Sequence, residues 1–210
     1  MTQALDALAA QMLNAAKAAG ADAADAMAVR GTSLSVDVRA GKLEEAQREE
    51  GTDIGLRVFV GQRTAIVSSS DTTSRTLSEM AERAVAMARE APENPYAGLA
   101  DPAQLARDRD VEALELFDPS DEPAPADLQE DAAQAEAAAL EVQGISQVQS
   151  ASAGYGARDI FIAGSNGFAG GYRRTDRGLS CVAIAGTGTG MERDYDGDSR
   201  IFQSDLRSAA

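Results

Sequence analysis

GISQVQSASAGYGARDIFIAGSNGFAGGYRRTDRGLSCVAIAGTGTGMERDYDGDSRIF, residues 144–202, is the stretch that decides the fold. It contains apolar, β-prone runs separated by glycine-rich segments that are typical of turns. Each run needs backbone hydrogen-bond partners, so we expect a sheet that the rest of the chain completes and covers. The expected strands are residues 145–152, 159–164, 168–174 and 179–185, and the acidic segment after them is expected to be a loop.

A second β-rich block precedes this stretch. Between residues 26 and 69 apolar side chains alternate with polar ones, which predicts an antiparallel meander with one buried and one wet face. The expected strands are residues 33–39, 43–48, 54–60 and 63–69, with turns at Ala40-Gly41 and Gly61-Gln62.

Helices are expected around these blocks. The apolar residues of 2–19 and of 74–90 recur with the period of an amphipathic helix, and strong helix formers favour a third helix at 126–142. Thr2 is the expected N-cap of the first helix and Gly20 the residue that follows it. Thr76 and Glu79 are placed for a capping box in the second if that helix starts late.

All six prolines lie between residues 92 and 125, which predicts an irregular surface connection with a helical turn near 102–106 and a short strand at 114–117. The chain then divides into helix–meander–helix (1–91), connection (92–125) and helix followed by a β block (126–210). The sequence predicts an α+β fold. Its largely antiparallel, twisted sheet is built from the two β-rich blocks and covered by about three helices.

Composition excludes several classes of protein. The net charge of −15 over 210 residues disfavours nucleic-acid binding, which depends on clustered Lys and Arg. A single cysteine, Cys181, excludes an internal disulfide and fits a reducing cytoplasm. Because it lies in an apolar run, we expect its thiol to be buried and unreactive. We find neither a signal peptide nor an apolar run of about 18 residues, so we expect no membrane contact and a cytoplasmic location.

The chain has no histidine. This excludes Ser-His and Cys-His nucleophiles, histidine bases and every histidine-containing zinc site built from these residues alone. We therefore assign no catalytic residue.

Two segments resemble ligand sites, and we prefer a structural interpretation of both. Residues 186–190, GTGTG, lack the spacing and the following apolar helix of a dinucleotide loop, so we interpret them as a strand connection. Asp194, Asp196 and Asp198 fill the first three ligand positions of a calcium loop. However, Ser199 stands where the loop needs glycine and Asp205 where it needs glutamate. We interpret the three aspartates as a solvated acidic turn.

Four segments resemble the TldD/PmbA family, and specifically its PmbA (TldE) branch. They are residues 41–71 (GKLEEAQREEGTDIGLRVFVGQRTAIVSSSD), 114–122 (LELFDPSDE), 165–186 (SNGFAGGYRRTDRGLSCVAIAG) and 190–198 (GMERDYDGD). Their order matches that of the family. After Tyr195 the chain departs from the family pattern, because Asp-Gly-Asp replaces an aromatic or small polar segment.

The resemblance implies a function. Full-length members are about twice this long, so the chain corresponds to their N-terminal half and lacks the C-terminal domain. TldD-type members carry an HExxxH zinc motif beyond this region. PmbA-type members, once named modulators of DNA gyrase, lack a working motif and pair with a TldD-like subunit. That subunit carries the zinc of a cytoplasmic protease acting on unfolded peptides.

On this interpretation the chain is a non-catalytic, oligomeric subunit domain that binds peptide or partner through sheet edges and turns. The residues assigned to binding lie in the SNGFAGGY and MERDY motifs; they are Ser165, Asn166, Gly167, Tyr172, Glu192, Arg193, Asp194 and Tyr195. Two alternatives stay open. The complete protein is itself a zinc peptidase whose HExxxH lies beyond these residues, or the chain is a stand-alone interaction module.

Overall fold

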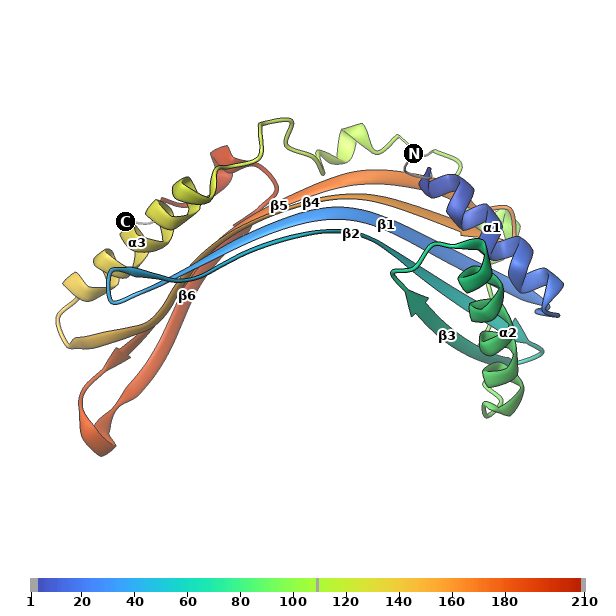
Figure 1. The fold of residues 1–210 in the computed structure, drawn as a ribbon, viewed down its shortest axis with the longest axis horizontal. Coiled ribbons are helices and arrows are strands. Elements are labelled where there is room, and N and C mark those ends of the chain that lie inside the picture. Colours follow the sequence, from blue (N-terminus) through green and yellow to red (C-terminus); the bar gives the residue numbers. More distant parts are fainter. Residues whose placement is uncertain (1–3, 109, 209–210) are drawn as a thin grey trace. The chain divides into compact units, whose positions relative to one another are not determined.

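The computed structural model describes residues 4–108 and 110–208 and confirms an α+β fold. Its helices are α1 (Leu5–Ala18), α2 (Ser74–Glu90) and α3 (Pro125–Glu141) (Figure 1). Its strands are β1 (Ala23–Arg39), β2 (Lys42–Val60), β3 (Arg63–Ser69), β4 (Ile145–Gly164), β5 (Ala169–Ala185) and β6 (Glu192–Arg200). They form one six-stranded antiparallel sheet in the order β3-β2-β1-β4-β5-β6.

The chain folds as two compact units, and long strands contribute to both. Unit 1 comprises Met1–Gly31, Gly51–Ala113 and Asp159–Tyr172, and unit 2 comprises Thr32–Glu50, Leu114–Arg158 and Arg173–Ala210. The two β-rich blocks of the sequence are therefore not two domains. Each unit takes strand segments from both blocks.

The core of unit 1 lies between α1, α2 and the sheet. Leu8 and Met12 of α1 and Leu77 of α2 pack against Ile54 and Leu56 of β2. The remaining buried positions on these helices are mostly alanine, which lets the backbones of helices and strands approach closely. The apolar faces expected for residues 2–19 and 74–90 are thus confirmed.

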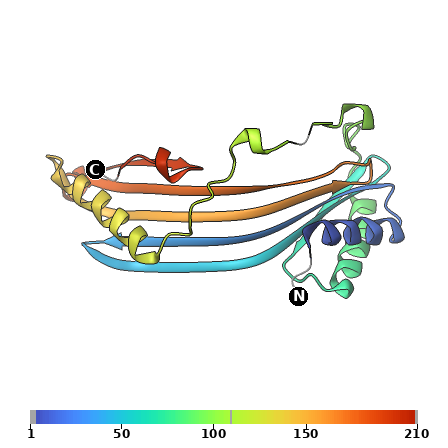
Figure 2. The same ribbon diagram turned by 90° about the horizontal axis from the view of Figure 1, so that it is seen from above.

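The core of unit 2 lies under α3, which runs along the sheet in Figure 2. Leu128 and Ala132 of α3 pack with Leu34 and Val36 of β1 and with Tyr155 of β4. Further along the helix, Ala135 packs with Val148 and Ala151. The expected third helix is confirmed, beginning at Pro125, whose missing N–H costs nothing in the first turn of a helix.

Helix ends differ in detail from the sequence-based expectation. Gly20 follows α1 with a φ of +94°, as expected, whereas Thr2 lies outside the described residues and the N-cap position is Ala4. The N-cap of α2 is Thr73, whose hydroxyl accepts a hydrogen bond from the Thr76 N–H. The expected capping box at Thr76 and Glu79 is wrong because the helix begins earlier than that pairing requires.

The meander and its two turns are confirmed, but the strands are longer than expected. Residues 43–48 and 54–60 belong to the single strand β2, and the four strands expected between 145 and 185 are only β4 and β5. The strand expected at 114–117 is wrong. That segment contains the end of the short 3-10 turn η2 (Glu112–Leu114) and makes one backbone contact, from the Thr175 N–H to the Leu116 carbonyl at 3.0 Å. The turn expected near 102–106 is present as η1 (Pro102–Gln104).

Two glycines inside β4 and β5 lie close to a neighbouring strand. A Cβ at Gly171 would lie 2.7 Å from the Ile160 carbonyl oxygen, and one at Gly156 would lie 2.7 Å from a carboxylate oxygen of Asp176. These glycines allow close approach between neighbouring strands rather than a change of chain direction.

Gly171→Ala is therefore expected to lower the free energy of unfolding by about 1–3 kcal/mol, because a backbone oxygen cannot move aside as a side chain can. Gly55→Ala, in the same unit, is the matched control. Its added methyl meets no atom within 4 Å, so stability should stay within about 1 kcal/mol of wild type. Urea unfolding measures both, and equal effects would contradict the assigned crowding.

Candidate peptide-binding and partner-binding surfaces

The SNG turn between β4 and β5 is closed by its own backbone. The Gly164 N–H donates to the Phe168 carbonyl at 2.9 Å, and Gly167 has a φ of +92°. Residues 165–167 thus form the turn expected between the strands 159–164 and 168–174.

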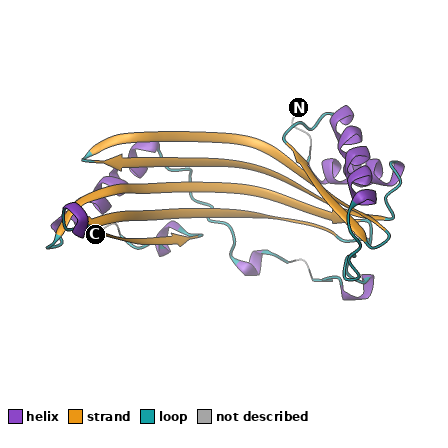
Figure 3. Cartoon of the chain, turned by 90° about the horizontal axis from the view of Figure 1, so that it is seen from below, coloured by secondary structure: helices purple, strands orange, loops and turns teal. Residues whose placement is uncertain are grey.

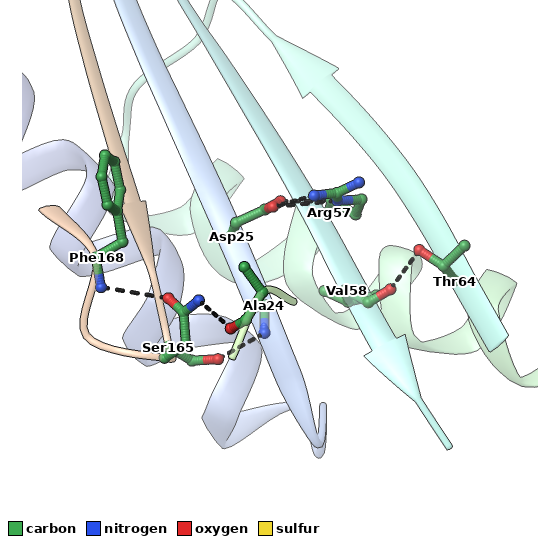
Figure 4. Close-up of polar contacts among 9 residues, drawn as sticks. Ala24, Asp25, Arg57, Val58, Thr64, Ser165 and Phe168 are labelled. Carbon is green, nitrogen blue, oxygen red and sulfur yellow. Dashed lines mark hydrogen bonds and ion pairs between the residues drawn. The ribbon is translucent and has the colours of Figure 1, made fainter. Parts of the chain in front are cut away.

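The polar side chains of this turn bind neighbouring segments of unit 1. The Ser165 hydroxyl accepts a hydrogen bond from the Ala24 N–H at 3.0 Å (Figure 4). The Asn166 side chain donates to the Ala100 carbonyl at 3.0 Å. Ser165 and Asn166 thus attach the turn to β1 and to the proline-rich connection. In the same close-up Arg57 forms an ion pair with Asp25 across β2 and β1.

The predicted binding residues fall into two groups. Ser165, Asn166, Gly167 and the half-buried Tyr172 belong to unit 1, whereas residues 192–195 belong to unit 2. Residues 192–195 are exposed and are the first four residues of β6, the strand at the edge of the sheet next to β5 (Figure 3). Tyr195, which lies opposite Val182, is 79% exposed.

The acidic segment is a β-strand, which corrects the expected loop. Asp194, Asp196 and Asp198 lie opposite Ala183, Cys181 and Leu179 of β5, so the three carboxylates share one face of β6. Arginines partly neutralise the row, and this makes strand pairing of such an acidic segment tolerable.

Each of these carboxylates has a different set of partners. Asp196 pairs with Arg207 at 2.9 Å and Asp198 with Arg200 at 2.9 Å. The hydrogen bond from Arg207 is the main cause that lowers the pKa of Asp196. Within residues 4–108 and 110–208, the carboxylate of Asp194 accepts a hydrogen bond only from the adjacent Tyr195 N–H, at 2.8 Å.

The GTGTG segment and Cys181 have structural rather than ligand-binding roles. Residues 186–190 connect β5 to β6 through the 3-10 turn η3 (Gly188–Gly190). Cys181 is half-buried rather than fully buried, and burial, followed by the charge of Glu136, raises the pKa of its thiol. A raised pKa reduces the thiolate fraction, as expected for an unreactive cysteine.

The sequence did not reveal a buried polar network in unit 2. The Asp118 N–H donates to the Thr175 hydroxyl at 2.9 Å, and that hydroxyl donates to the Ile201 carbonyl at 3.1 Å. Arg177 donates to Ser120 at 3.0 Å and lies over the Tyr155 ring, 4.9 Å from its centroid. This network attaches both the proline-rich connection and the segment after β6 to β5.

Neither a metal centre nor a membrane span is found in the described part of the chain. Between residues 4 and 208, with position 109 excepted, no three His, Cys, Asp or Glu side chains are arranged to hold a metal ion. None of the helices described there is both long and apolar enough to cross a membrane.

Two family models match successive parts of the chain. Residues 24–88 match "PmbA/TldA metallopeptidase domain 1", and residues 118–210 match "PmbA/TldA metallopeptidase central domain". The chain belongs to the PmbA/TldD family. Metalloprotease PmbA of Escherichia coli O157:H7 is 32% identical over 190 residues, which cover 89% of this chain and 41% of that protein.

Solved structures of the family have the same fold. A Bacteroides thetaiotaomicron protein named as a modulator of DNA gyrase superimposes with a TM-score of 0.77 at 21% identity, covering 96% of this chain and 46% of its own. TldE of Thermococcus kodakarensis superimposes with a TM-score of 0.69 at 15% identity, covering 95% and 44%. The chain spans less than half the length of each of these relatives.

Proposed function

We propose that this chain is a non-catalytic, PmbA/TldE-like part of a TldD/TldE-type metalloprotease that acts on unfolded peptides. The proposal rests on one combination: the chain belongs to a metallopeptidase family, yet its 210 residues include no histidine. A chain without histidine cannot build an HExxxH-type zinc site, and the described residues hold no group of three Cys, Asp or Glu side chains that could bind a metal ion. On this proposal the zinc belongs to a TldD-like partner subunit.

The role of this chain is to bind peptide and partner. In unit 2 the two edge strands of the sheet are β2 and β6. Among the described residues, β3 pairs with β2 only from Ile54 onward, which leaves the earlier part of β2 without an outer partner. The strand β6 is the last of the sheet, so its outer side has no partner strand there either. Unpaired strand edges supply N–H and C=O groups that an extended peptide can use. We propose that such edges help to line a chamber shared with the partner.

Reconstitution with a TldD-like subunit from the same organism tests the proposal. We expect co-elution in size-exclusion chromatography and cleavage of an unfolded peptide by the mixture only, with loss of cleavage on zinc chelation. A TldD-like subunit that is fully active alone and never associates with this chain would refute the proposal.

A second candidate rests on the fraction of the relatives that the chain spans. Because it covers 41% of PmbA, a complete protein has room for further domains. If residues beyond this region include HExxxH, the complete protein is itself a zinc peptidase. Zinc analysis of that complete protein, purified without any partner, distinguishes the two candidates.

A further inference from the structure

The outer edge of β6 is open to another strand. All nine residues of β6 pair with β5 on the inner side, and within residues 4–108 and 110–208 no strand pairs with the outer side. The side chains along this edge are exposed, apart from that of Asp198. A strand added here would gain main-chain hydrogen bonds and would bring its side chains beside those of β6.

The face of β6 on the side of α3 is acidic and would favour basic side chains on an added strand. Asp194, Asp196 and Asp198 occupy this face at every second position. Cross-strand neighbours of opposite charge stabilise a pair of strands, and like charges destabilise it. Lysine or arginine at alternate positions of the added strand would therefore face a row of carboxylates.

The chain itself shows how a guanidinium binds at this row. Arg207 donates to the Asp196 carboxylate at 2.9 Å and to the Gly197 carbonyl at 3.0 Å. Asp194, by contrast, has no cation partner in the part of the chain that the structure describes. The row therefore has two occupied cation positions, at Asp196 and Asp198, and one open position, at Asp194.

An apolar groove adjoins the same row. A cavity of about 510 Å³ lies between α3 and the strands β5 and β6. Its apolar walls include Ala135, Ala139, Val142 and Leu179, and its polar side includes Asp196, Asp198 and Arg207, the partner of Asp196. A long basic side chain can lay its methylene stem on such apolar walls while its charged head stays at the carboxylates.

We propose that the outer edge of β6 binds an extended peptide segment with lysine or arginine at alternate positions, its basic side chains directed toward Asp194 and the α3 groove. The site deepens the proposed function, on which it rests, by naming a class of peptide. The net charge of −15 also favours encounter with basic ligands.

Fluorescence anisotropy with a labelled peptide of alternating Arg and Val tests strand pairing on this chain. Only every second N–H group of an added strand points at the edge of β6. N-methylation of those alternate residues should abolish binding, whereas N-methylation of the residues between them should leave the affinity unchanged. The matched Glu-Val peptide should not bind. Equal loss in both frames, or binding of the Glu-Val peptide, would overturn the proposal.

Substitution locates the site. Asp194→Lys should weaken binding of the Arg-Val peptide by about five- to tenfold, since an attractive cross-strand pair becomes repulsive. Glu82→Lys, on the exposed face of α2, makes the same change in net charge and should leave affinity unchanged. Circular dichroism confirms that both variants are folded. An equal effect of the two variants would show binding by net charge alone and refute the edge site.

Two further outcomes distinguish the peptide site from self-association of the chain and from the proposed protease function. Dimerisation of the chain alone that Asp194→Lys abolishes would assign the edge to a second copy and overturn the peptide site. Failure of the Arg-Val peptide to bind, in a chain that still activates a TldD-like subunit, would refute the edge site and leave the proposed function intact.

Discussion

Replacing Asp118 with alanine is expected to lower the free energy of unfolding by about 3–5 kcal/mol, because it leaves a buried arginine without its carboxylate. Asp118 is 7% exposed and Arg177 is 6% exposed, and the Arg177 Nε atom lies 3.9 Å from the Asp118 Oδ2 atom. Removal of one partner of a buried charge pair costs more than the pair itself contributes.

The carboxylate of Asp118 also orders the backbone around it. It accepts hydrogen bonds from the Ser120 N–H at 2.9 Å and from the Gln203 N–H at 2.8 Å. The alanine variant loses both, so the connection before α3 and the segment after β6 should lose protection from hydrogen exchange together. Protection of the unit 1 core should change less.

The pH dependence of this effect has a defined sign. Burial would raise the pKa of Asp118, but hydrogen bonds from Gln203 and Ser120 and the charge of Arg177 outweigh it and hold the pKa below its ordinary value. A depressed pKa stabilises the folded state above the unfolded-state pKa of about 4, and that contribution is lost as the pH falls through the folded-state pKa.

The stability difference between wild type and Asp118→Asn should therefore shrink as the pH falls from about 4 through the folded-state pKa of Asp118. Urea unfolding at a series of pH values measures it. Asp121→Ala is the matched control, since its exposed side chain has no part in the network and only its carbonyl accepts from Arg177. A loss as large in Asp121→Ala would contradict the role given to Asp118.

Local patterns predicted the helices well because the signal is contained in the helices themselves. The apolar residues that mark 74–90 all lie on the buried face of α2, and its bounds agree with the expectation. The strand interiors could not be predicted in the same way. Whether Gly156 makes a turn or continues a strand depends on the neighbouring strand, which lies elsewhere in the sequence.

The strand β6 shows the same difficulty in stronger form. Acidic residues and glycine disfavour strands locally, so residues 192–198 predicted a loop. Pairing with β5 and the arginines at 200 and 207 reverse that preference. Neither arginine can be assigned to an aspartate from spacing alone.

The candidate site could be predicted as motifs but not as contacts. MERDY marked an exposed edge, but its acidic run was interpreted as a solvated acidic turn, whereas it forms a strand. The Asp118 network escaped notice because LELFDPSDE and the strand containing Thr175 and Arg177 are brought together only by the fold. No periodicity connects two such segments.

Glu136 is expected to be the second site of large effect, with Glu136→Ala lowering the free energy of unfolding by about 2–4 kcal/mol through two lost charge-assisted hydrogen bonds. This side chain of α3 is 3% exposed. Its two oxygens accept from the Ala40 and Gly41 N–H groups at 2.6 and 2.7 Å. Both turn residues have positive φ, 51° and 70°, so the carboxylate holds a backbone conformation that alanine adopts poorly.

Two measurements separate this role from a general loss of helix α3. Urea unfolding should show a smaller loss for Glu136→Gln, which keeps one acceptor oxygen, and almost none for Glu141→Ala at the exposed end of α3. Because the charge of Glu136 adds to burial in raising the pKa of the Cys181 thiol, Glu136→Gln should lower that pKa and speed alkylation. Unchanged alkylation together with full stability would show that the carboxylate is not held at the β1–β2 turn.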